Sequence, residues 1–456
     1  MIILEVVHIY HTNDLHSHFE HWPRIHTLLT DRKKWHTEAG DSVLLLDIGD
    51  HVDRFHPYSD GTMGRGNVDL LNETQYTAIT IGNNEGITFP FEALDTMYKE
   101  AKFPVIVANL FYEDGSRPSW AEASKIITTN EGTRIGLIGI TVFYEHLYRL
   151  LGWKITDPFV ELRKQVEELK RQTDILILLS HMGINEDEAI ARDFPEIDVI
   201  LGAHTHHVLH EGREINNSLV CAAGKYGQFV GHVILELENH MIQKRKAVLY
   251  DTNELAPVRS EENLVTEYFD EGKQLLQDEV IELHQEITAD AFNNSPLSTL
   301  LCDALREWCE ADCAFLNAGL LLDGLNKGTV TRFDLLDICP HPINPATVLL
   351  EGDELKEVLL QTKDEQWPHL QVRGLGFRGV VMGKFIYSGI TFKDNQETIE
   401  IFINGEKINH HKQYKVAIPD MFTFGRFFPA IFRSKSKHYF LPEFMRDLLE
   451  WKLKSV

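Results

Sequence analysis

The chain has 456 residues, with 44 basic and 69 acidic side chains, so its formal net charge is 44 − 69 = −25. Domains usually hold roughly 100–200 residues, and the length therefore predicts two or three of them. A surface this acidic repels phosphate backbones, which argues against a nucleic-acid polymer as partner. A protein of this charge that handles phosphates needs a source of positive charge, and metal ions are the simplest one.

Hydropathy and cysteine usage predict the compartment. No run of the sequence approaches the roughly 18–20 apolar residues of a membrane span, so no membrane partner is expected. The N-terminus has no basic region, and Glu5 interrupts its short apolar run, which is unlike a signal peptide. The five cysteines are odd in number and lie mostly in apolar segments, as reduced thiols do. We therefore expect a cytoplasmic protein, whose oligomeric state the sequence does not give.

The first half of the chain alternates short apolar runs with helical patterns. The apolar runs predicted as strands are 6–10, 43–48, 76–81, 105–108, 135–140, 175–179 and 199–201. The helical patterns cover 22–35, 91–101 and 159–172. This alternation predicts a layered α/β domain with β-α-β crossovers. Two later runs, 219–223 and 230–237, have no helix between them and are predicted to form hairpins.

The pattern changes near residue 240. Pro257 ends one region, and Ser260 followed by two glutamates is typical of a helix start, with apolar residues then recurring at helical spacing as far as Ile281. We expect this helix to link two domains. Ser295 followed by Pro296 predicts a capped helix over 297–310, and strands and turns follow it. The expected division is a first domain at 1–255, a linker helix at 256–287 and a second domain at 288–456.

Five short polar clusters follow apolar runs of the first half. They are Asn13-Asp14-Leu15-His16, Gly49-Asp50, Gly82-Asn83-Asn84-Glu85, Ser180-His181 and Gly202-Ala203-His204-Thr205-His206. In open α/β sheets, residues beyond the carboxyl ends of the strands converge on one crevice. The five clusters are therefore predicted to form one site, although they span nearly 200 positions of the chain.

The residue types of these clusters favour metal binding. Carboxylates, imidazoles and an amide oxygen suit divalent manganese, zinc, iron or cobalt, and the absence of cysteine argues against a structural zinc site. Asp14 and His16, two residues apart, share one side of an extended segment, as do His204 and His206. A carboxylate such as Asp50 can bridge two ions about 3.5–4 Å apart. Each motif alone is more often a turn or a hydrogen-bonded core histidine, but five of them at five strand ends predict a metal centre.

The ordered set Asp-x-His, Gly-Asp, Gly-Asn, His and Gly-x-His-x-His resembles the calcineurin-like metallophosphoesterases. The segment 11–18, His-Thr-Asn-Asp-Leu-His-Ser-His, resembles their 5′-nucleotidase/UDP-sugar hydrolase branch, in its cytoplasmic bacterial form. Asn317-Ala318-Gly319 and the segments 328–331 and 349–359 resemble the C-terminal substrate domain of that branch. The resemblance implies a four-layer α/β/β/α metallophosphoesterase domain followed by a C-terminal α/β substrate domain of the 5′-nucleotidase type.

The resemblance also implies a ligand set and a reaction. One divalent ion would be held by Asp14, His16, Asp50 and His206, and a second by Asp50, Asn83, His181 and His204. Two such ions would activate a water as hydroxide for attack on a phosphate ester, most directly on a nucleotide or a related small phosphate ester.

The chain departs from the family where a proton donor is expected. The familiar motif is Gly-Asn-His-Glu with an Asp two residues further on, and the corresponding positions here are Asn84 and Ile87. We assign Asn84 to the catalytic position, where its amide can hydrogen-bond an oxyanion but cannot supply a proton at neutral pH. Three kinds of protein remain open: a slower enzyme, a cyclic-nucleotide or nucleotide-sugar phosphodiesterase, and a metal- and nucleotide-binding protein with little turnover. A nearby histidine, His18 or His51, could also take over the role of the missing proton donor.

The substrate pocket follows the family less closely. The arginine usual after Asn-x-Gly is absent, while Phe385 follows Gly383 as one stacking residue does in the family. Most of the segment 422–428 is expected to be core. The predicted substrate-binding residues are Asn317, Phe385, Arg378 and Phe424, with Arg373 and Arg426 as further phosphate contacts.

Overall fold

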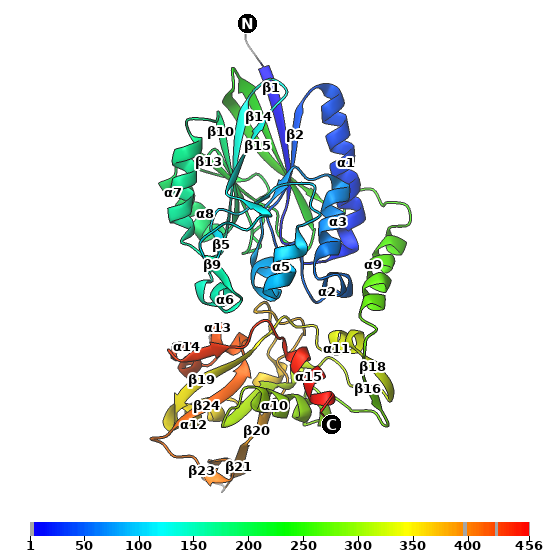
Figure 1. The fold of residues 1–456 in the computed structure, drawn as a ribbon, viewed down its shortest axis with the longest axis vertical. Coiled ribbons are helices and arrows are strands. Elements are labelled where there is room, and N and C mark those ends of the chain that lie inside the picture. Colours follow the sequence, from blue (N-terminus) through cyan, green and yellow to red (C-terminus); the bar gives the residue numbers. More distant parts are fainter. Residues whose placement is uncertain (1–3, 395–398, 425–426, 456) are drawn as a thin grey trace. The chain divides into compact units, whose positions relative to one another are not determined.

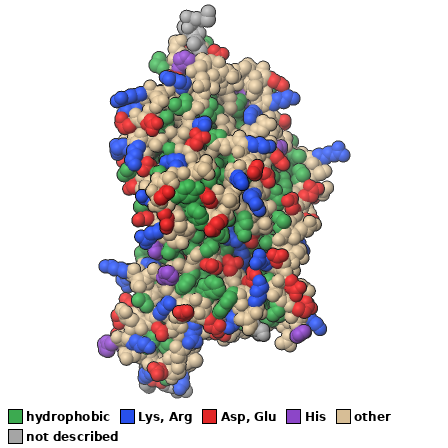
Figure 2. Space-filling view, in the orientation of Figure 1, with side chains coloured by type: hydrophobic (Ala, Val, Ile, Leu, Met, Phe, Trp, Pro, Cys, Tyr) green, Lys and Arg blue, Asp and Glu red, His purple; other side chains and the backbone are tan. Residues whose placement is uncertain are grey.

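The computed structural model describes residues 4–394, 399–424 and 427–455. The chain divides into two compact units, residues 1–272 and 273–456 (Figure 1). Acidic and basic side chains are interspersed over the visible face, among scattered apolar ones (Figure 2). Among the described residues, no helix combines the length and the apolar character needed to cross a bilayer.

The first unit contains a seven-stranded sheet in the order β15-β14-β1-β2-β3-β4-β6. Its strands are β1 (Leu4–Thr12), β2 (Ser42–Asp47), β3 (Ala78–Ile79), β4 (Val105–Ile106), β6 (Ala121–Glu122), β14 (Phe229–Glu238) and β15 (Met241–Asp251). The strands from β1 to β6 are parallel, whereas β14 and β15 extend the sheet antiparallel to β1.

A second sheet of six strands has the order β12-β13-β11-β10-β8-β7. Its strands are β7 (Ser124–Thr128), β8 (Arg134–Thr141), β10 (Ile175–His181), β11 (Val199–Gly202), β12 (Arg213–Ile215) and β13 (Ser218–Ala222). The central strands β8, β10, β11 and β13 are parallel, and β7 and β12 pair antiparallel at the edges.

The two sheets pack face to face between helices. Val7 and Ile9 of the first sheet share a core cluster with Ile177 and Leu179 of the second, because alternate residues of a strand point to one face. The other face of the second sheet packs on α7 (Pro158–Leu169) and α8 (Ile184–Asp193). Helices α1 (Trp22–Ala39) and α3 (Arg65–Thr74) lie outside the first sheet (Figure 1). This arrangement confirms the predicted four-layer α/β/β/α domain.

Shorter elements complete the first unit. They are α2 (Pro57–Gly61), α4 (Asn83–Thr88), α5 (Phe91–Met97), α6 (Glu145–Leu150) and the paired strands β5 (Leu110–Tyr112) and β9 (Trp153–Ile155).

The two runs predicted as hairpins do not pair with each other. The first becomes β13, which pairs with β12 and β11, and the second becomes β14, which pairs with β15 and β1. The chain therefore changes sheets between them, turning at Gly224 and Gly227, whose φ angles are 73° and 65°. Both strands bury one face in the core between the sheets, and this explains why each run is so apolar.

The helix expected beyond Ser260 is α9 (Glu261–Leu275). Its predicted extension to Ile281 is wrong, because residues Glu279–Leu283 form strand β16, paired antiparallel with β18 (Gly328–Thr331). The apolar spacing there reflects Val280 and Leu283, which are buried in the core of the second unit.

The second unit is built on a mixed five-stranded sheet in the order β20-β17-β24-β19-β25. Its strands are β17 (Cys313–Asn317), β19 (Pro345–Glu351), β20 (Phe385–Ser388), β24 (Gln413–Pro419) and β25 (Lys437–Tyr439). A separate small sheet holds β21 (Ile390–Asp394), β22 (Ile399–Ile403) and β23 (Glu406–Lys407). The helices are α10 (Pro296–Trp308), α11 (Arg332–Ile338), α12 (Gly352–Gln361), α13 (Met421–Phe424), α14 (Pro429–Arg433) and α15 (Met445–Leu453).

The predicted cap of α10 is confirmed. The Ser295 hydroxyl accepts a hydrogen bond from the backbone N–H of Ser298, and Pro296 occupies the first helical position. This combination satisfies a helix N–H that would otherwise lack a partner.

Candidate metal centre

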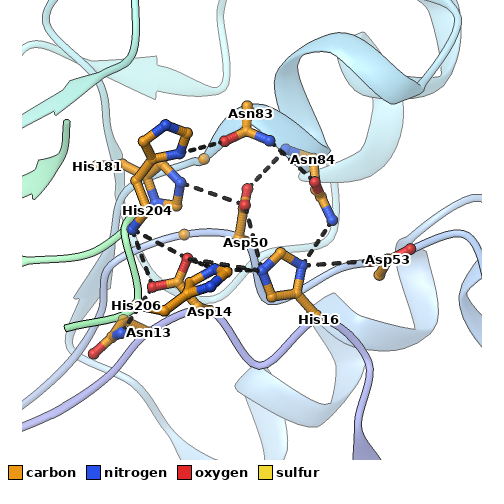
Figure 3. A network of polar contacts seen from close by, with 12 residues as sticks. Asn13, Asp14, His16, Asp50, Asp53, Asn83, Asn84, His181, His204 and His206 are labelled. Carbon is orange, nitrogen blue, oxygen red and sulfur yellow. Dashed lines mark hydrogen bonds and ion pairs between the residues drawn. The ribbon is translucent and has the colours of Figure 1, made fainter. Parts of the chain in front are cut away.

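The seven side chains predicted as metal ligands lie together at the carboxyl ends of strands from both sheets (Figure 3). From the first sheet come Asp14 and His16 after β1, Asp50 after β2, and Asn83 at the start of α4. From the second come His181 at the end of β10, and His204 and His206 after β11. The parallel strands deliver these side chains to one place although they are far apart in the chain.

Five of these residues have a left-handed backbone. The φ angles are 50° at Asp14, 49° at His16, 51° at Asp50, 70° at His204 and 56° at His206. Such a conformation costs a non-glycine residue about 1–3 kcal/mol, and it is typically retained where a side chain must be aimed precisely at a functional centre. The backbone of this site is therefore strained at the residues expected to bind metal.

Two glycines allow the loops to approach each other. A Cβ at Gly49 would lie 2.3 Å from the backbone nitrogen of Gly82, and Gly49 has a φ of 87°. A Cβ at Gly82 would lie 2.1 Å from Asp50 Oδ1 and 2.5 Å from His181 Cε1. Gly82 is thus needed because a Cβ would occupy the space of the Asp50 and His181 side chains, and Gly49 because a Cβ would meet the backbone of the neighbouring loop.

The side chains form two groups. In the first, His16 Nε2 lies 3.2 Å from His206 Nε2, and His206 Nε2 lies 3.5 Å from Asp14 Oδ1. In the second, Asp50, His181 and His204 each offer one atom within 4.8 Å of the others, and Asn83 Oδ1 lies 2.8 Å from His204 Nδ1.

Asp50 lies between the two groups. Its Oδ2 is 3.7 Å from His16 Nε2 in the first group and 3.4 Å from His181 Nε2 in the second. Its Oδ1 accepts the backbone N–H of Asn84 at 2.7 Å, which holds the carboxylate in this orientation.

The charge balance of the site calls for cations. Asp14 and Asp50 are both buried, with exposed fractions of 0% and 2%. Burial by itself would lower the pKa of His181, but the adjacent Asp50 and then Asp14 raise it to about 10. Two buried carboxylates need positive charge nearby, and either protons or metal ions can provide it.

His181 has the arrangement of a metal ligand. Its Nδ1 lies 2.7 Å from the carbonyl oxygen of Ile48, to which it donates a hydrogen bond. Its Nε2 is buried and faces Asp50 Oδ2 at 3.4 Å, and it makes no hydrogen bond within the described part of the chain. A histidine that donates from one nitrogen to an acceptor and presents the other is the usual form in metal sites. The residues present therefore fit a divalent cation.

Supporting residues hold the loops in place. The Asn13 amide donates to Asp14 Oδ2 and to the carbonyl of Gly224, both at 2.8 Å. The buried Glu85 carboxylate accepts three backbone N–H groups, those of Asp50, Val52 and Gly82. Both residues lie within the polar clusters of the sequence, but their supporting roles become visible only in the structure.

Two neighbours of the ligands were missed by the sequence reasoning. Asp53 Oδ2 lies 3.4 Å from His16 Nδ1, and the Tyr144 hydroxyl lies 3.2 Å from His204 Nε2. A signal was present for both, because Asp53 lies in the loop of Asp50 and Tyr144 shortly follows strand β8.

Asn84 is buried beside the first group. Its amide nitrogen contacts His16 Nδ1 at 2.9 Å and the carbonyl oxygen of Val52 at 3.1 Å. Of the two histidines considered as substitutes, His51 is 2% exposed and burial lowers its pKa to about 3. The side chain of His18 is 27% exposed, and its ring packs on Tyr226 at 3.9 Å.

The four predicted substrate-binding residues belong to the second unit. Asn317 and Phe385 are register partners on β17 and β20, and both are buried, with Phe385 packed among Phe315, Trp367 and other aromatic rings. Arg378 is half-buried and donates its backbone N–H to His341.

The segment around Phe424 divides between core and surface. Phe422 and Phe428 are fully buried, as expected, while Phe424 is 44% exposed and stacks on Tyr439. Arg373 is exposed, and Arg426 lies outside the described residues.

Comparison with known proteins agrees with this architecture. Residues 7–208 match the family described as calcineurin-like phosphoesterase, and residues 279–428 match the 5′-nucleotidase C-terminal domain. The chain is 45% identical, over 98% of its length and 99% of the relative's, to the uncharacterized metallophosphoesterase YunD of Bacillus subtilis. It is 24% identical to the snake venom 5′-nucleotidase of Crotalus adamanteus, over 91% of the chain and 81% of that protein.

Solved structures share the fold. The putative 5′-nucleotidase from Staphylococcus aureus superposes with a TM-score of 0.69 at 16% identity, covering 99% of this chain and 97% of that one. The NAD nucleotidase of Haemophilus influenzae superposes with a TM-score of 0.68 at 17% identity, and the match covers 99% of this chain and 96% of that one. Together with the matches along the sequence, these findings show that the chain belongs to the calcineurin-like metallophosphoesterases that carry a 5′-nucleotidase C-terminal domain, a family of hydrolases acting on phosphate esters.

Proposed function

We propose that this protein is a nucleotidase that hydrolyses a nucleotide phosphate ester with two divalent metal ions. The observation that carries the proposal is the position of Asp50, whose Oδ2 faces His16 of one group and His181 of the other. One carboxylate facing two ligand groups is what a site for two ions requires. The buried Nε2 of His181 supports the same assignment, because it faces Asp50 and makes no hydrogen bond among the described residues.

The proposed ligands keep the assignment made from the sequence. Asp14, His16, Asp50 and His206 would hold one ion, and Asp50, Asn83, His181 and His204 the other. When bound, such ions lower the pKa of a coordinated water and neutralise charge on phosphoryl oxygens. Ions of the borderline class, manganese, zinc, iron or cobalt, match this mixture of carboxylate, imidazole and amide ligands.

The chain's own residues position the reacting groups. Glu85 ties the loop of Asp50 to the loop of Gly82 through backbone hydrogen bonds, and Asn13 orients Asp14. The buried carboxylates are shielded from bulk water, so their attraction for cations and for their histidine partners is stronger than it would be at the surface. This preorganisation is the main contribution that a protein makes to phosphoryl transfer.

A nucleotide is the proposed substrate because of the second unit. Its match to the 5′-nucleotidase C-terminal domain and the activities named for several relatives support this choice.

A second candidate keeps the site but changes the leaving group. The amide nitrogen of Asn84 is directed at His16 and at the carbonyl of Val52, and an amide cannot donate a proton to a departing alkoxide. This favours a substrate whose leaving group needs no proton, such as a nucleotide sugar, from which a phosphate departs. A cyclic nucleotide would use the same site, although its ring opening expels a ribose oxygen that does need a proton. The same feature favours the third candidate, a protein that binds metal and nucleotide with little turnover.

A phosphate-release assay distinguishes the candidates. Metal-stripped protein would be reloaded with manganese, zinc or cobalt and tested on a nucleoside monophosphate, a nucleotide sugar, a cyclic nucleotide and pyrophosphate. A preference for the monophosphate supports the nucleotidase, and a preference for the nucleotide sugar or the cyclic ester supports the second candidate. Two bound ions without hydrolysis of any of these substrates would overturn both enzymatic proposals.

The assay needs a matched control. His206→Ala removes a proposed ligand, whereas His207→Ala removes the adjacent, exposed histidine, whose Nδ1 contacts Thr205. We expect only the first substitution to abolish metal-dependent turnover.

A further inference from the structure

Three buried histidines form a second cluster in the first unit, separate from the site described above. His8 belongs to β1, His36 to the last turn of α1, and His232 to β14. Their exposed fractions are 7%, 4% and 4%. Val7 and Ile9 on either side of His8 face the core between the sheets, so His8 points to the opposite face, toward α1.

One ring nitrogen from each histidine lies within 4.8 Å of the others. His8 Nδ1 is 3.0 Å from His232 Nε2. Two histidines on one tetrahedral zinc ion have ligand nitrogens about 3.3 Å apart, as follows from zinc–nitrogen bonds of about 2.0–2.1 Å. The observed separation is thus close to that of two ligands of one ion.

The other nitrogen of each ring faces an oxygen. Asp41 Oδ2 lies 3.5 Å from His8 Nε2 and 3.8 Å from His36 Nδ1. The Tyr250 hydroxyl lies 3.4 Å from His232 Nδ1. An oxygen acceptor behind each imidazole is the arrangement that fixes the tautomer of metal-bound histidines.

We propose that His8, His36 and His232 bind one divalent transition-metal ion of the zinc class, in addition to the two ions of the phosphoesterase site. His8 Nδ1, His36 Nε2 and His232 Nε2 are the ligand atoms. The opposite nitrogens of His8 and His232 then donate their hydrogens to Asp41 and Tyr250, and that of His36 faces Asp41 at 3.8 Å. The fourth position falls to water or to the Tyr10 hydroxyl, which lies 3.0 Å from His36 Nε2.

Burial, with a smaller effect of the nearby Arg32, disfavours positive charge on the histidines of the cluster. Burial lowers the pKa of all three histidines, to about 4 for His36 and about 3 for His232. The rings are therefore neutral at physiological pH, which is the form that binds metal. The Asp41 side chain, which contacts His8, is 31% exposed.

Binding requires a small adjustment of two rings. His8 and His36 are stacked, with centroids 3.5 Å apart and an angle of 24° between the planes. Their lone pairs run side by side in this arrangement, so the rings must turn toward each other to share an ion. The competing explanation is a metal-free network in which Tyr250, His232, His8 and Asp41 are linked by hydrogen bonds between neutral rings.

The experiment separates this ion from those of the phosphoesterase site. In the variant Asp14→Asn/Asp50→Asn, zinc is added in excess, removed by gel filtration and counted by elemental analysis. We expect one ion per chain, lost when His36→Gln is added and retained with His26→Gln, which changes another histidine of α1 that contacts Thr74. Absence of the ion from the parent variant, or its persistence with His36→Gln, would overturn the proposal.

A second measurement does not depend on the folding of histidine variants. Crystals of the Asp14→Asn/Asp50→Asn protein soaked in zinc are expected to show an anomalous peak between the rings of His8, His36 and His232. Unmoved rings with no peak between them would establish the hydrogen-bonded network instead. Neither measurement reads catalytic activity, so a failure of the proposed nucleotidase function would not affect the outcome.

Discussion

The Nδ1 of His181 donates a hydrogen bond to the carbonyl oxygen of Ile48 at 2.7 Å, across the interface between the two sheets. Ile48 directly follows β2 of the first sheet, whereas His181 ends β10 of the second. The bond fixes the tautomer of the imidazole and directs Nε2 toward Asp50. The packing of the two sheets therefore sets the orientation of a proposed metal ligand.

Replacing this histidine is expected to disable the centre. In His181→Gln the Ile48 carbonyl can still accept a hydrogen bond, but the ligand nitrogen is gone. We expect the second ion to be lost and turnover to fall by about 10³-fold or more, because several kcal/mol of transition-state stabilisation disappear with it. Steady-state kinetics with elemental analysis measures both effects, and His207→Gln is the matched control. Normal turnover in His181→Gln would remove this residue from the ligand set.

A single methyl group at Gly82 is expected to have a similar effect without deleting any ligand. The Cβ of Gly82→Ala would lie 2.1 Å from Asp50 Oδ1, so the carboxylate must move. We expect weaker metal binding and a marked loss of activity. Gly115→Asn is the control, since no heavy atom lies nearer than 3.8 Å to a Cβ at Gly115 and asparagine tolerates its φ of 85°. Unchanged metal affinity in Gly82→Ala would show that Asp50 is not a ligand.

Restoring the family's proton donor tests the role of position 84. In Asn84→His/Ile87→Asp, an imidazole oriented by a carboxylate would be able to protonate a leaving alkoxide. General acid catalysis contributes about 10²–10⁴-fold, so turnover of a nucleoside monophosphate is expected to rise. Hydrolysis of p-nitrophenyl phosphate, whose leaving group needs no proton, is expected to change little. Equal effects on both substrates would argue against a missing acid as the limitation.

The stability of the first unit is expected to depend on pH through Asp187. This carboxyl group is 1% exposed and accepts a hydrogen bond from Ser180, and burial raises its pKa to about 8 from an ordinary 3.8. The folded state holds this proton more tightly than the unfolded state does. The stabilisation that Asp187 adds to the unfolding free energy is therefore complete below about pH 4 and is lost as the pH rises to about 8.

Asp187→Asn removes this titration while keeping the shape of the side chain. Relative to the variant, the parent protein is expected to lose on the order of a few kcal/mol of unfolding free energy as the pH rises over that interval. Urea unfolding at several pH values between those limits measures the difference. The same pH dependence in both proteins would contradict the assigned pKa.

The amino-acid sequence by itself determined the features that depend on local chemistry. The order of the polar clusters and their positions after apolar runs can be read directly, because a change from apolar to polar residues marks the end of a buried strand. The Ser295-Pro296 start of α10 follows from the hydrogen-bonding needs of one helical turn. Family resemblance then supplied the ligand set and the two-domain architecture, of which the architecture is confirmed and the ligand set stays a prediction.

Only the tertiary structure decided which distant residues meet. The two sheets of the first unit face each other, and this brings Asp50 close to His181. Val280 packs in the core of the second unit and lies in a strand rather than a helix. The positive φ angles at the ligands and the meeting of His8, His36 and His232 are equally invisible in the sequence. Such features depend on contacts between segments far apart in the chain, whereas patterns of neighbouring residues report only on the local backbone and on which face is buried.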